Sequence, residues 1–171
     1  MEVKEAFKFC PRCSARFNKT AHHLKCPSCG LSYYLNPKPV QSVILKNEQN
    51  EILFVVRSIE PRKGYLDFPG GFVDEDEGFE ESARREIKEE LGIDVGSLKY
   101  LSDHTDDYPF EEISYRTIGI TYIGKLPAGA ILKPADDVSG VEFYKLESVP
   151  IDRLAWPSMH EMLANLKTKA S

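Results

Sequence analysis

The stretch that most restricts how this chain can fold runs from Gly71 to Ile93 and reads GFVDEDEGFEESARREIKEELGI. It starts on the last residue of a Pro-Gly-Gly turn, continues through an acidic loop, and then runs in strong helix formers to Gly92, a helix C-cap signal. Apolar residues recur at every fourth position of the predicted helix and form one stripe, which indicates a face packed on a core. The stripe consists of Phe79, Ala83, Ile87 and Leu91.

Three glutamates of the same helix, Glu86, Glu89 and Glu90, occupy positions i, i+3 and i+4. They share an arc of about 100° beside the apolar stripe. Carboxylates this close repel one another unless a cation lies between them, and their hard oxygen atoms suit Mg²⁺ or Mn²⁺. The alternative is a solvated acidic face, the ordinary outcome for a glutamate-rich helix, and the i, i+4 charge ladder over residues 80–88 fits it.

The whole string resembles the Nudix box of Nudix hydrolases. Gly71, five residues, Glu77, seven residues and then REIKEELGI over residues 85–93 match every defined position of that box. The resemblance implies an α/β/α sandwich with a mixed β-sheet, over roughly residues 40 to 168. It also implies a divalent ion held by the three glutamates, with the backbone carbonyl of Gly71 completing the shell, and hydrolysis of a phosphoric anhydride.

Other roles carried by the resemblance concern Arg85 and the general base. Arg85 corresponds to the box arginine that holds the catalytic loop, by pairing with Glu77. The base differs between members of the family, so Glu86 or Glu89 inside the box is one prediction. Acids outside the box are the other. Asp137 leads because it lies in the loop before a late strand, where relatives place such an acid, and Glu111 and Glu112 follow. A surface acid is the ordinary alternative for each.

The rest of the chain predicts an α+β or α/β fold with a mixed sheet between helices. Alternating and β-branched runs predict strands at Val40–Leu45, Glu51–Arg57, Leu98–Ser102, Ile113–Ile123 and Val141–Lys145, with loops at Asp103–Glu112 and Leu126–Val138. A C-terminal helix over Met159–Leu166, capped by Ser158, is predicted to turn Met159, Met162, Leu163 and Leu166 inward.

All four cysteines lie near the N-terminus, in two CxxC knuckles, Cys10-Pro-Arg-Cys13 and Cys26-Pro-Ser-Cys29. This spacing predicts a Cys₄ structural zinc ribbon. Disulfides or a redox CxxC are the alternatives, but a cytosolic chain disfavours the first and the second needs a βαβ context. His22 and His23 could replace a ligand, although four thiolates already fill the shell. We predict a ribbon over residues 1–36 and a Nudix domain over 37–171.

Composition and charge indicate where the protein is located and which kinds of partner it can bind. The N-terminus lacks an apolar signal region and no run is long enough to cross a membrane, so a cytoplasmic protein is predicted. The formal net charge of −5 does not favour non-specific nucleic-acid binding overall. Basic residues of the ribbon could still contact a phosphate or RNA, although a solvated surface is the commoner outcome. They are Arg12, Arg16, Lys19 and Lys25.

A zinc ribbon ahead of a Nudix domain resembles two groups, the NADH pyrophosphatases and the FAD and ADP-ribose pyrophosphatase-like proteins. NADH pyrophosphatases carry an SQPWPFPxS-type motif, where this chain has only DYPFE over residues 107–111, and its tail, 149–156, looks more like the second group. The predicted substrate is therefore a nucleoside diphosphate linked to another moiety, as in NADH, FAD or ADP-ribose. Removal of NAD caps from RNA and a non-catalytic nucleotide sensor are the alternatives.

Substrate-binding residues are predicted from their places beside the expected cleft. Arg57 ends a strand and could bind a phosphate, while four aromatic residues could stack on a nucleoside base. These are Tyr65, Phe68, Tyr108 and Phe110, and core or rim packing is the alternative for each. The predicted partner is a small dinucleotide or nucleotide-sugar type molecule, and the resemblance admits a homodimer.

Overall fold

The computed structural model describes residues 1–19 and 23–169 of the chain. They divide into two compact units. The first contains Met1–Lys38 and Asp107–Thr117, and the second contains Pro39–Asp106 and Ile118–Ser171. Because a segment from late in the chain belongs to the first unit, the domain boundary expected after residue 36 stays a prediction.

A three-stranded antiparallel sheet in the order β1-β2-β3 forms the frame of the first unit. Its elements are α1 (Val3–Ala6), β1 (Asn18–Lys19), β2 (His23–Lys25) and β3 (Ser32–Tyr34). The buried side chains of Phe17 and Leu24 lie with two cysteines in a core of their own. The segment 107–117 contributes through Ser114, whose backbone N–H donates to the carbonyl of Met1 at 2.8 Å.

A seven-stranded sheet runs through the second unit in the order β10-β5-β4-β9-β8, with β6 paired to β5 and β7 paired to β4. The strands are β4 (Lys38–Lys46), β5 (Ile52–Arg57), β6 (Leu66–Asp67), β7 (Gly70–Phe72), β8 (Lys99–Phe110), β9 (Ile113–Lys125) and β10 (Val138–Tyr144). The helices are α2 (Phe79–Leu91) and α3 (Ser158–Lys169), with short 3₁₀ turns η1 (Leu146–Ser148) and η2 (Ile151–Arg153).

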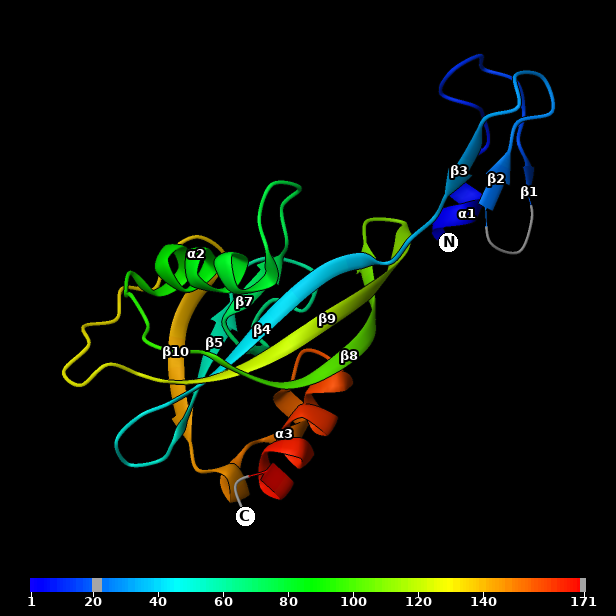
Figure 1. The fold of residues 1–171 in the computed structure, drawn as a ribbon. Coiled ribbons are helices and arrows are strands. Elements are labelled where there is room, and N and C mark those ends of the chain that lie inside the picture. The colour runs from blue at the N-terminus through cyan, green and yellow to red at the C-terminus, as the bar shows by residue number, and fades with distance from the viewer. Residues whose placement is uncertain (20–22, 170–171) are drawn as a thin grey trace. The chain divides into compact units, whose positions relative to one another are not determined.

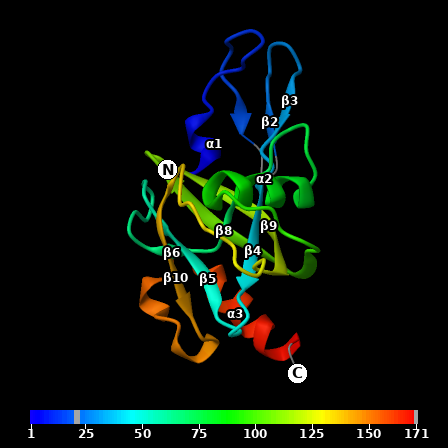
Figure 2. The same ribbon diagram turned by 90° about the vertical axis from the view of Figure 1, so that its left-hand side faces the viewer.

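The two helices cover opposite faces of this sheet (Figures 1 and 2). Alternate side chains of β4 and β5 therefore enter two separate cores. Val43 and Leu53 pack with the α2 residues Ala83, Ile87 and Leu91. Ile44, Ile52 and Phe54 pack with the α3 residues Met159, Met162, Leu163 and Leu166. The predicted sandwich with helices on both sides of a mixed sheet is confirmed, as are the inward faces of both helices.

One predicted loop is wrong. Residues 103–112 were expected to form an acidic loop, yet β8 continues as a strand to Phe110. The strand lies at the end of the sheet path, where polar side chains and Pro109 are tolerated because one edge needs no partner. Because residues 103–110 have few apolar side chains, the sequence pattern did not indicate a strand, and pairing with β9 is what forms it.

The expected cap of the last helix also differs. Ser158 is the first residue of α3 rather than its cap, and its backbone N–H donates to Asp106 Oδ1 at 3.3 Å. A carboxylate from β8 thus satisfies an N–H group at the helix start, and it does so from 52 residues away in the chain. Across residues 1–19 and 23–169, no helix is both long and apolar enough to cross a bilayer.

Protonation of His104 is expected to weaken the fold as the pH falls below its ordinary pKa of 6.5. The buried ring on β8 has Nδ1 3.2 Å from the Thr121 hydroxyl and fills the space over Gly119. Burial lowers the pKa of His104, and the charges of Asp106 and Asp103 offset this only partly. The unfolded chain then binds this proton at a higher pH than the folded chain, so acid favours unfolding.

A His104→Gln variant should accordingly lose less unfolding free energy than the wild type between about pH 7 and pH 5. Urea unfolding at several pH values measures this difference. Parallel losses in the two proteins would show that His104 does not contribute to the acid sensitivity.

Candidate active site

The Nudix-box segment forms a strand, a loop and a helix that fix one another. Gly92 has φ of 71°, as a left-handed C-cap requires, and its N–H donates to the Lys88 carbonyl at 3.0 Å. At the other end of α2, Glu81 Oε2 accepts the Gly78 N–H at 2.8 Å. The helix thus begins and ends where the sequence predicts, and its Glu86–Glu90 face lies beside β7.

Glu90 is the most buried acid of the box, with 3% of its surface exposed. Its Oε2 accepts the Gly70 N–H at 3.1 Å. The pKa of Glu90 is raised well above its ordinary value, first by burial and then by the charges of Asp137 and Glu86. A carboxylate held under repulsion in this way is destabilising at neutral pH, which is typical of a functional group rather than a structural one.

Gly71 brings main chain directly against a box carboxylate. A Cβ at this position would lie 2.5 Å from Glu86 Oε1, so any larger residue would displace the end of the Glu86 side chain. Glycine here therefore leaves the Glu86 carboxylate in its position, and its backbone angles do not require glycine. Burial also raises the pKa of Glu86, only partly offset by the adjacent guanidinium of Arg85.

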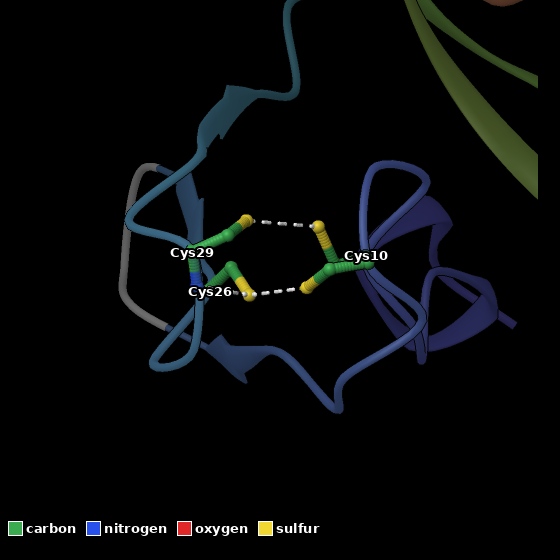
Figure 3. A group of neighbouring side chains, drawn as sticks. Cys10, Cys26 and Cys29 are labelled. Carbon is green, nitrogen blue, oxygen red and sulfur yellow. Dashed lines mark hydrogen bonds between the residues drawn. The ribbon is translucent and has the colours of Figure 1, made fainter.

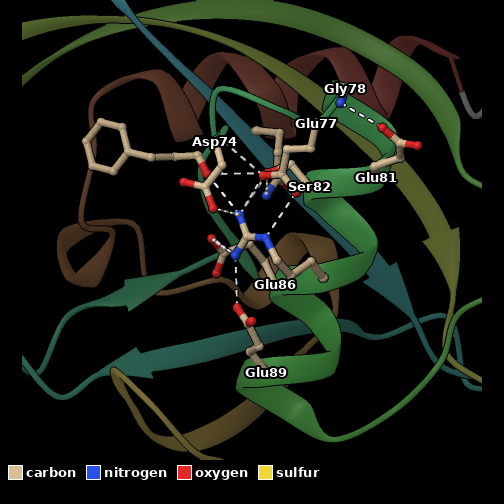
Figure 4. A network of polar contacts seen from close by, with 10 residues as sticks. Asp74, Glu77, Gly78, Glu81, Ser82, Glu86 and Glu89 are labelled. Carbon is tan, nitrogen blue, oxygen red and sulfur yellow. Dashed lines mark hydrogen bonds and ion pairs between the residues drawn. The ribbon is translucent and has the colours of Figure 1, made fainter.

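Arg85 links the acidic loop to the helix through Glu77, Glu86 and Glu89, which are labelled in the network of Figure 4. It donates from Nη2 and Nε to the two carboxylate oxygens of Glu77, at 2.6 and 3.0 Å. Its Nη1 donates to Glu86 Oε1 at 3.0 Å and to Glu89 Oε2 at 2.9 Å. The hydrogen bonds from Arg85 are the main reason that the pKa of Glu77 is lowered to about 2. The pairing of Arg85 with Glu77 agrees with the predicted loop-holding role.

The same contacts modify one sequence inference. The repulsion between Glu86 and Glu89 was expected to demand a metal ion, but in this structure Arg85 is the cation between them. Glu89 is also the most exposed of the three, with 48% of its side chain accessible. Crowding alone therefore does not require a metal at that pair, whereas no hydrogen bond from Arg85 reaches Glu90.

Asp137 joins these two acids from outside the box. It lies immediately before β10, and its carbonyl accepts the Ser58 N–H at 2.7 Å. Its charge raises the pKa of both Glu86 and Glu90, and a small pocket is lined by Asp137, Glu90 and Gly70. Glu111 and Glu112, the other outside candidates, belong to the first unit and remain predictions.

Main-chain hydrogen bonds fix the loop that carries Asp137. The N–H groups of Lys133 and Ala135 donate to the carbonyls of Leu91 and Glu90, each at 3.0 Å. These carbonyls belong to the last turn of α2 and have no partner within the helix. The loop therefore caps the C-terminal end of α2, and these bonds fix the position of Asp137 relative to the box helix.

These acids are candidate ligands for a hard divalent cation, and that role stays a prediction. Asp137 and Glu86 lie close enough to Glu90 for their charges to raise its pKa, and a Cβ added to Gly71 would lie 2.5 Å from Glu86 Oε1. Carboxylate and carbonyl oxygens are the donors that Mg²⁺ and Mn²⁺ prefer. Arg85 already binds Glu77 and Glu89 as well as Glu86, so it leaves the charge at Glu90 uncompensated.

Arg57 belongs to a group that sequence reasoning found only in part. Its Nη1 donates to Asp67 Oδ2 at 3.1 Å, and its guanidinium lies 5.4 Å from the centre of the Trp156 ring. Trp156 Nε1 donates to the same Asp67 oxygen at 2.7 Å. Asp67 and Trp156 were not predicted. A signal existed for both, since Asp67 stands two residues before the Pro-Gly-Gly turn and Trp156 is the only tryptophan of the chain.

The four aromatic candidates separate into three situations. Phe68 is 2% exposed and its ring stacks on Phe54, with 5.0 Å between ring centres, although it also lines the pocket beside Glu90; its stacking on a base stays a prediction. Tyr65 is half-buried beneath the Arg62 guanidinium, 5.5 Å from its ring centre. Tyr108 and Phe110 stack on each other in the first unit, 6.4 Å apart, and their part in substrate binding stays a prediction.

The four cysteines bring their sulfur atoms within 4.8 Å of one another (Figure 3). Cys10 and Cys29 Sγ lie 3.6 Å apart, and Cys13 and Cys26 Sγ lie 3.5 Å apart, so all four are free thiols. Sulfurs bound at about 2.3 Å around a tetrahedral zinc are roughly 3.8 Å apart, so the cluster is compatible with that ion. Of the two nearby histidines, His23 stacks on Tyr34 instead, and His22 lies outside the described residues.

Comparisons with known proteins agree with this geometry. A family model described as the NUDIX domain matches residues 36–166. The chain is 26% identical over 145 residues to a NAD-capped RNA hydrolase NudC of Pseudomonas aeruginosa, covering 84% of this chain and 49% of that one. It is 36% identical over 119 residues to an ADP-ribose pyrophosphatase of Methanocaldococcus jannaschii, covering 68% and 67%.

Among solved structures, the NUDIX domain of Shewanella oneidensis NrtR, crystallised with ADP ribose, superposes with a TM-score of 0.66. The match covers 80% of this chain and 90% of that one at 20% identity, so it bears on the fold alone. The chain spans about half the length of the NudC relative.

Proposed function

The chain belongs to the NUDIX domain family, and on that premise we propose that it is a metal-dependent pyrophosphohydrolase. Its substrate would be a nucleoside diphosphate linked to another moiety, of the NADH, FAD or ADP-ribose type. The observation that carries the proposal is Glu90, a buried carboxylate whose pKa is raised by burial and by the charges of Asp137, Glu86 and Asp67. Such an arrangement disfavours the charged form of Glu90, and a bound cation would offset that effect.

In this proposal Glu86, Glu90 and the Gly71 carbonyl hold Mg²⁺ or Mn²⁺, with Glu89 available as a further ligand. The bound ion would neutralise the anhydride and lower the pKa of a coordinated water. Asp137, or a box glutamate such as Glu86 or Glu89, accepts the proton of the attacking water. Arg85 keeps Glu77 and the acidic loop in place through the paired hydrogen bonds described above.

Zinc is the second metal of the proposal. Cys10, Cys13, Cys26 and Cys29 would hold it in a closed shell that leaves no position for substrate, so its part is to fold the ribbon. The assignment of residues 1–36 to the ribbon and 37–171 to the hydrolase belongs to the same proposal. The cytoplasmic location and the homodimer remain predictions.

NAD-cap removal from RNA is the second candidate, and one feature of the first unit favours it. Residues 1–38 hold seven Lys or Arg and two Glu, a formal charge of +5, and 107–117 adds one Arg and three acids, so this unit carries +3 although the whole chain carries −5. In β2 and β3, His23 and Tyr34 stack at 5.3 Å, and Tyr34 is 64% exposed. Aromatic rings beside basic residues suit single-stranded nucleic acid. Relatives named NAD-capped RNA hydrolase point the same way.

A substrate panel separates these candidates. NADH, FAD, ADP-ribose and a short NAD-capped RNA are incubated in ¹⁸O water with and without Mg²⁺ or Mn²⁺, and the products are read by phosphorus NMR. We expect metal-dependent release of two monophosphates, with ¹⁸O in one of them. Preference for the capped RNA, abolished by Tyr34→Ala while NADH turnover is unchanged, would favour the second candidate. Absence of turnover on every substrate would contradict both candidates and favour the hypothesis of a non-catalytic nucleotide sensor.

A further inference from the structure

A buried carboxylate outside the box connects the C-terminal segment to the pocket. Asp67 accepts three hydrogen bonds, from Trp156 Nε1 at 2.7 Å, Arg57 Nη1 at 3.1 Å and the Phe68 N–H at 2.9 Å. Its residue is 9% exposed, so these bonds are shielded from competing water. None of the chemistry proposed above uses Asp67 or Trp156.

The effect of these contacts is to fix Arg57. Its Nε donates to the Pro61 carbonyl at 2.9 Å, its Nη1 is held by Asp67, and its plane lies against the Trp156 ring. Three constraints on one guanidinium leave a single orientation. Only 12% of the Arg57 side chain is accessible, which confirms that it is packed rather than extended into solvent.

One end of this guanidinium remains available. Within residues 1–19 and 23–169, Nη2 of Arg57 donates no hydrogen bond, whereas its other two nitrogens do. Arg57 lines the same small pocket as Glu90, Gly70 and Asp137, and it is the only basic residue among those lining it. A guanidinium with free N–H groups beside a candidate metal site is suited to a phosphate oxygen.

We propose that Trp156 and Asp67 are positioning residues that orient Arg57 to bind a phosphate oxygen of the substrate next to the box acids. The C-terminal segment thereby sets substrate affinity although it lies outside the box. The inference rests on the proposed function, because it assumes a diphosphate substrate at this pocket.

The backbone supports this coupling. Ala155 N–H donates to the Leu66 carbonyl at 2.9 Å, and Leu154 forms a parallel bridge with Leu66. These contacts dock the segment after η2 onto β6, one residue before Asp67. Trp156 therefore meets Asp67 through a segment held by main-chain bonds, not through a free tail.

Trp156 offers a direct readout, because it is the only tryptophan of the chain. Intrinsic fluorescence is titrated with ADP-ribose in EDTA, where no turnover occurs. Phosphate binding at Arg57 should change the emission in a saturable way, because the guanidinium contacts the ring. Arg57→Lys, which cannot keep the forked geometry, should lose this response or weaken it about tenfold. Arg153→Lys, a change in the same segment that contacts Glu142 instead, should keep it.

Kinetics supply the second arm. Trp156→Phe keeps an aromatic face for Arg57 but removes the N–H that Asp67 accepts, so KM should rise about tenfold while kcat stays within about threefold. Asp67→Asn should act in the same direction, and thermal unfolding controls for lost structure. The inference is overturned if Trp156→Phe has the KM of the wild type, or if Arg57→Lys keeps the full fluorescence response. A wild type that neither binds nor hydrolyses any diphosphate would instead overturn the proposed function.

Discussion

Replacing Glu90 with glutamine is expected to lower kcat by about three orders of magnitude and, in EDTA, to raise the melting temperature. The first effect follows from loss of a metal-binding carboxylate, because a metal's stabilisation of transition-state charge is worth several kcal/mol. The second follows from the raised pKa of Glu90, since glutamine removes a charge repelled by Asp137 and Glu86. Glutamine can still accept the Gly70 N–H, so the fold keeps that bond.

Glu80→Gln is the matched control. It changes the same residue type on the same helix, in an exposed i, i+4 pair with Arg84 that is worth only a few tenths of a kcal/mol. Its kcat should equal that of the wild type. Steady-state kinetics and thermal melts with and without Mg²⁺ test all three proteins. Full activity of Glu90→Gln, or a lower melting temperature in EDTA, would remove the basis for placing the metal here.

Loss of zinc is expected to unfold the first unit while leaving the second intact. The buried apolar core around Cys10 and Cys26 is small, and its other buried members are Phe17 and Leu24. In such small modules the metal contributes about 10 kcal/mol or more of folding free energy. A Cys13→Ser variant should therefore bind well under one zinc per chain, and proteolysis should cleave residues 1–38 many times faster.

Ser28→Ala, within the second knuckle, keeps all four thiolates and should retain one zinc per chain. Elemental analysis of the purified proteins and limited proteolysis followed by mass spectrometry provide the measurements. Wild-type protein that is folded throughout and contains no zinc would refute the ribbon, whatever the hydrolase does.

The box and the cysteine knuckles were predictable because the spacing of their residues along the chain is enough to bring their side chains together. Four thiolates in two tight turns and carboxylates at i and i+4 of a helix need no knowledge of distant contacts. The role of Arg85 as the cation between Glu86 and Glu89 was less evident, because it depends on side-chain geometry that spacing does not determine.

Other features could not be derived from local pattern. The strand β8 is polar and occupies the end of the sheet, so its partner rather than its composition specifies it. The position of Phe68 just before the Pro-Gly-Gly turn suggested a residue at the rim of the cleft, yet its ring packs on Phe54 in the core. The link between Asp67 and Trp156 spans 89 residues, and only the fold brings them together.

The main-chain bonds from Lys133 and Ala135 to the end of α2 have a consequence for protein engineering. They depend on amide groups alone, so the exposed side chains of Ile131, Lys133 and Ala135 can be randomised in a library, with proline excluded at 133 and 135. Leu132, which packs against the core, and Asp136, which has a φ of 56°, are kept. The number of residues in that loop is not free. Deleting or inserting one residue would shift Asp137 relative to the end of α2. Evolution or design can therefore change the sequence of this loop more readily than its length.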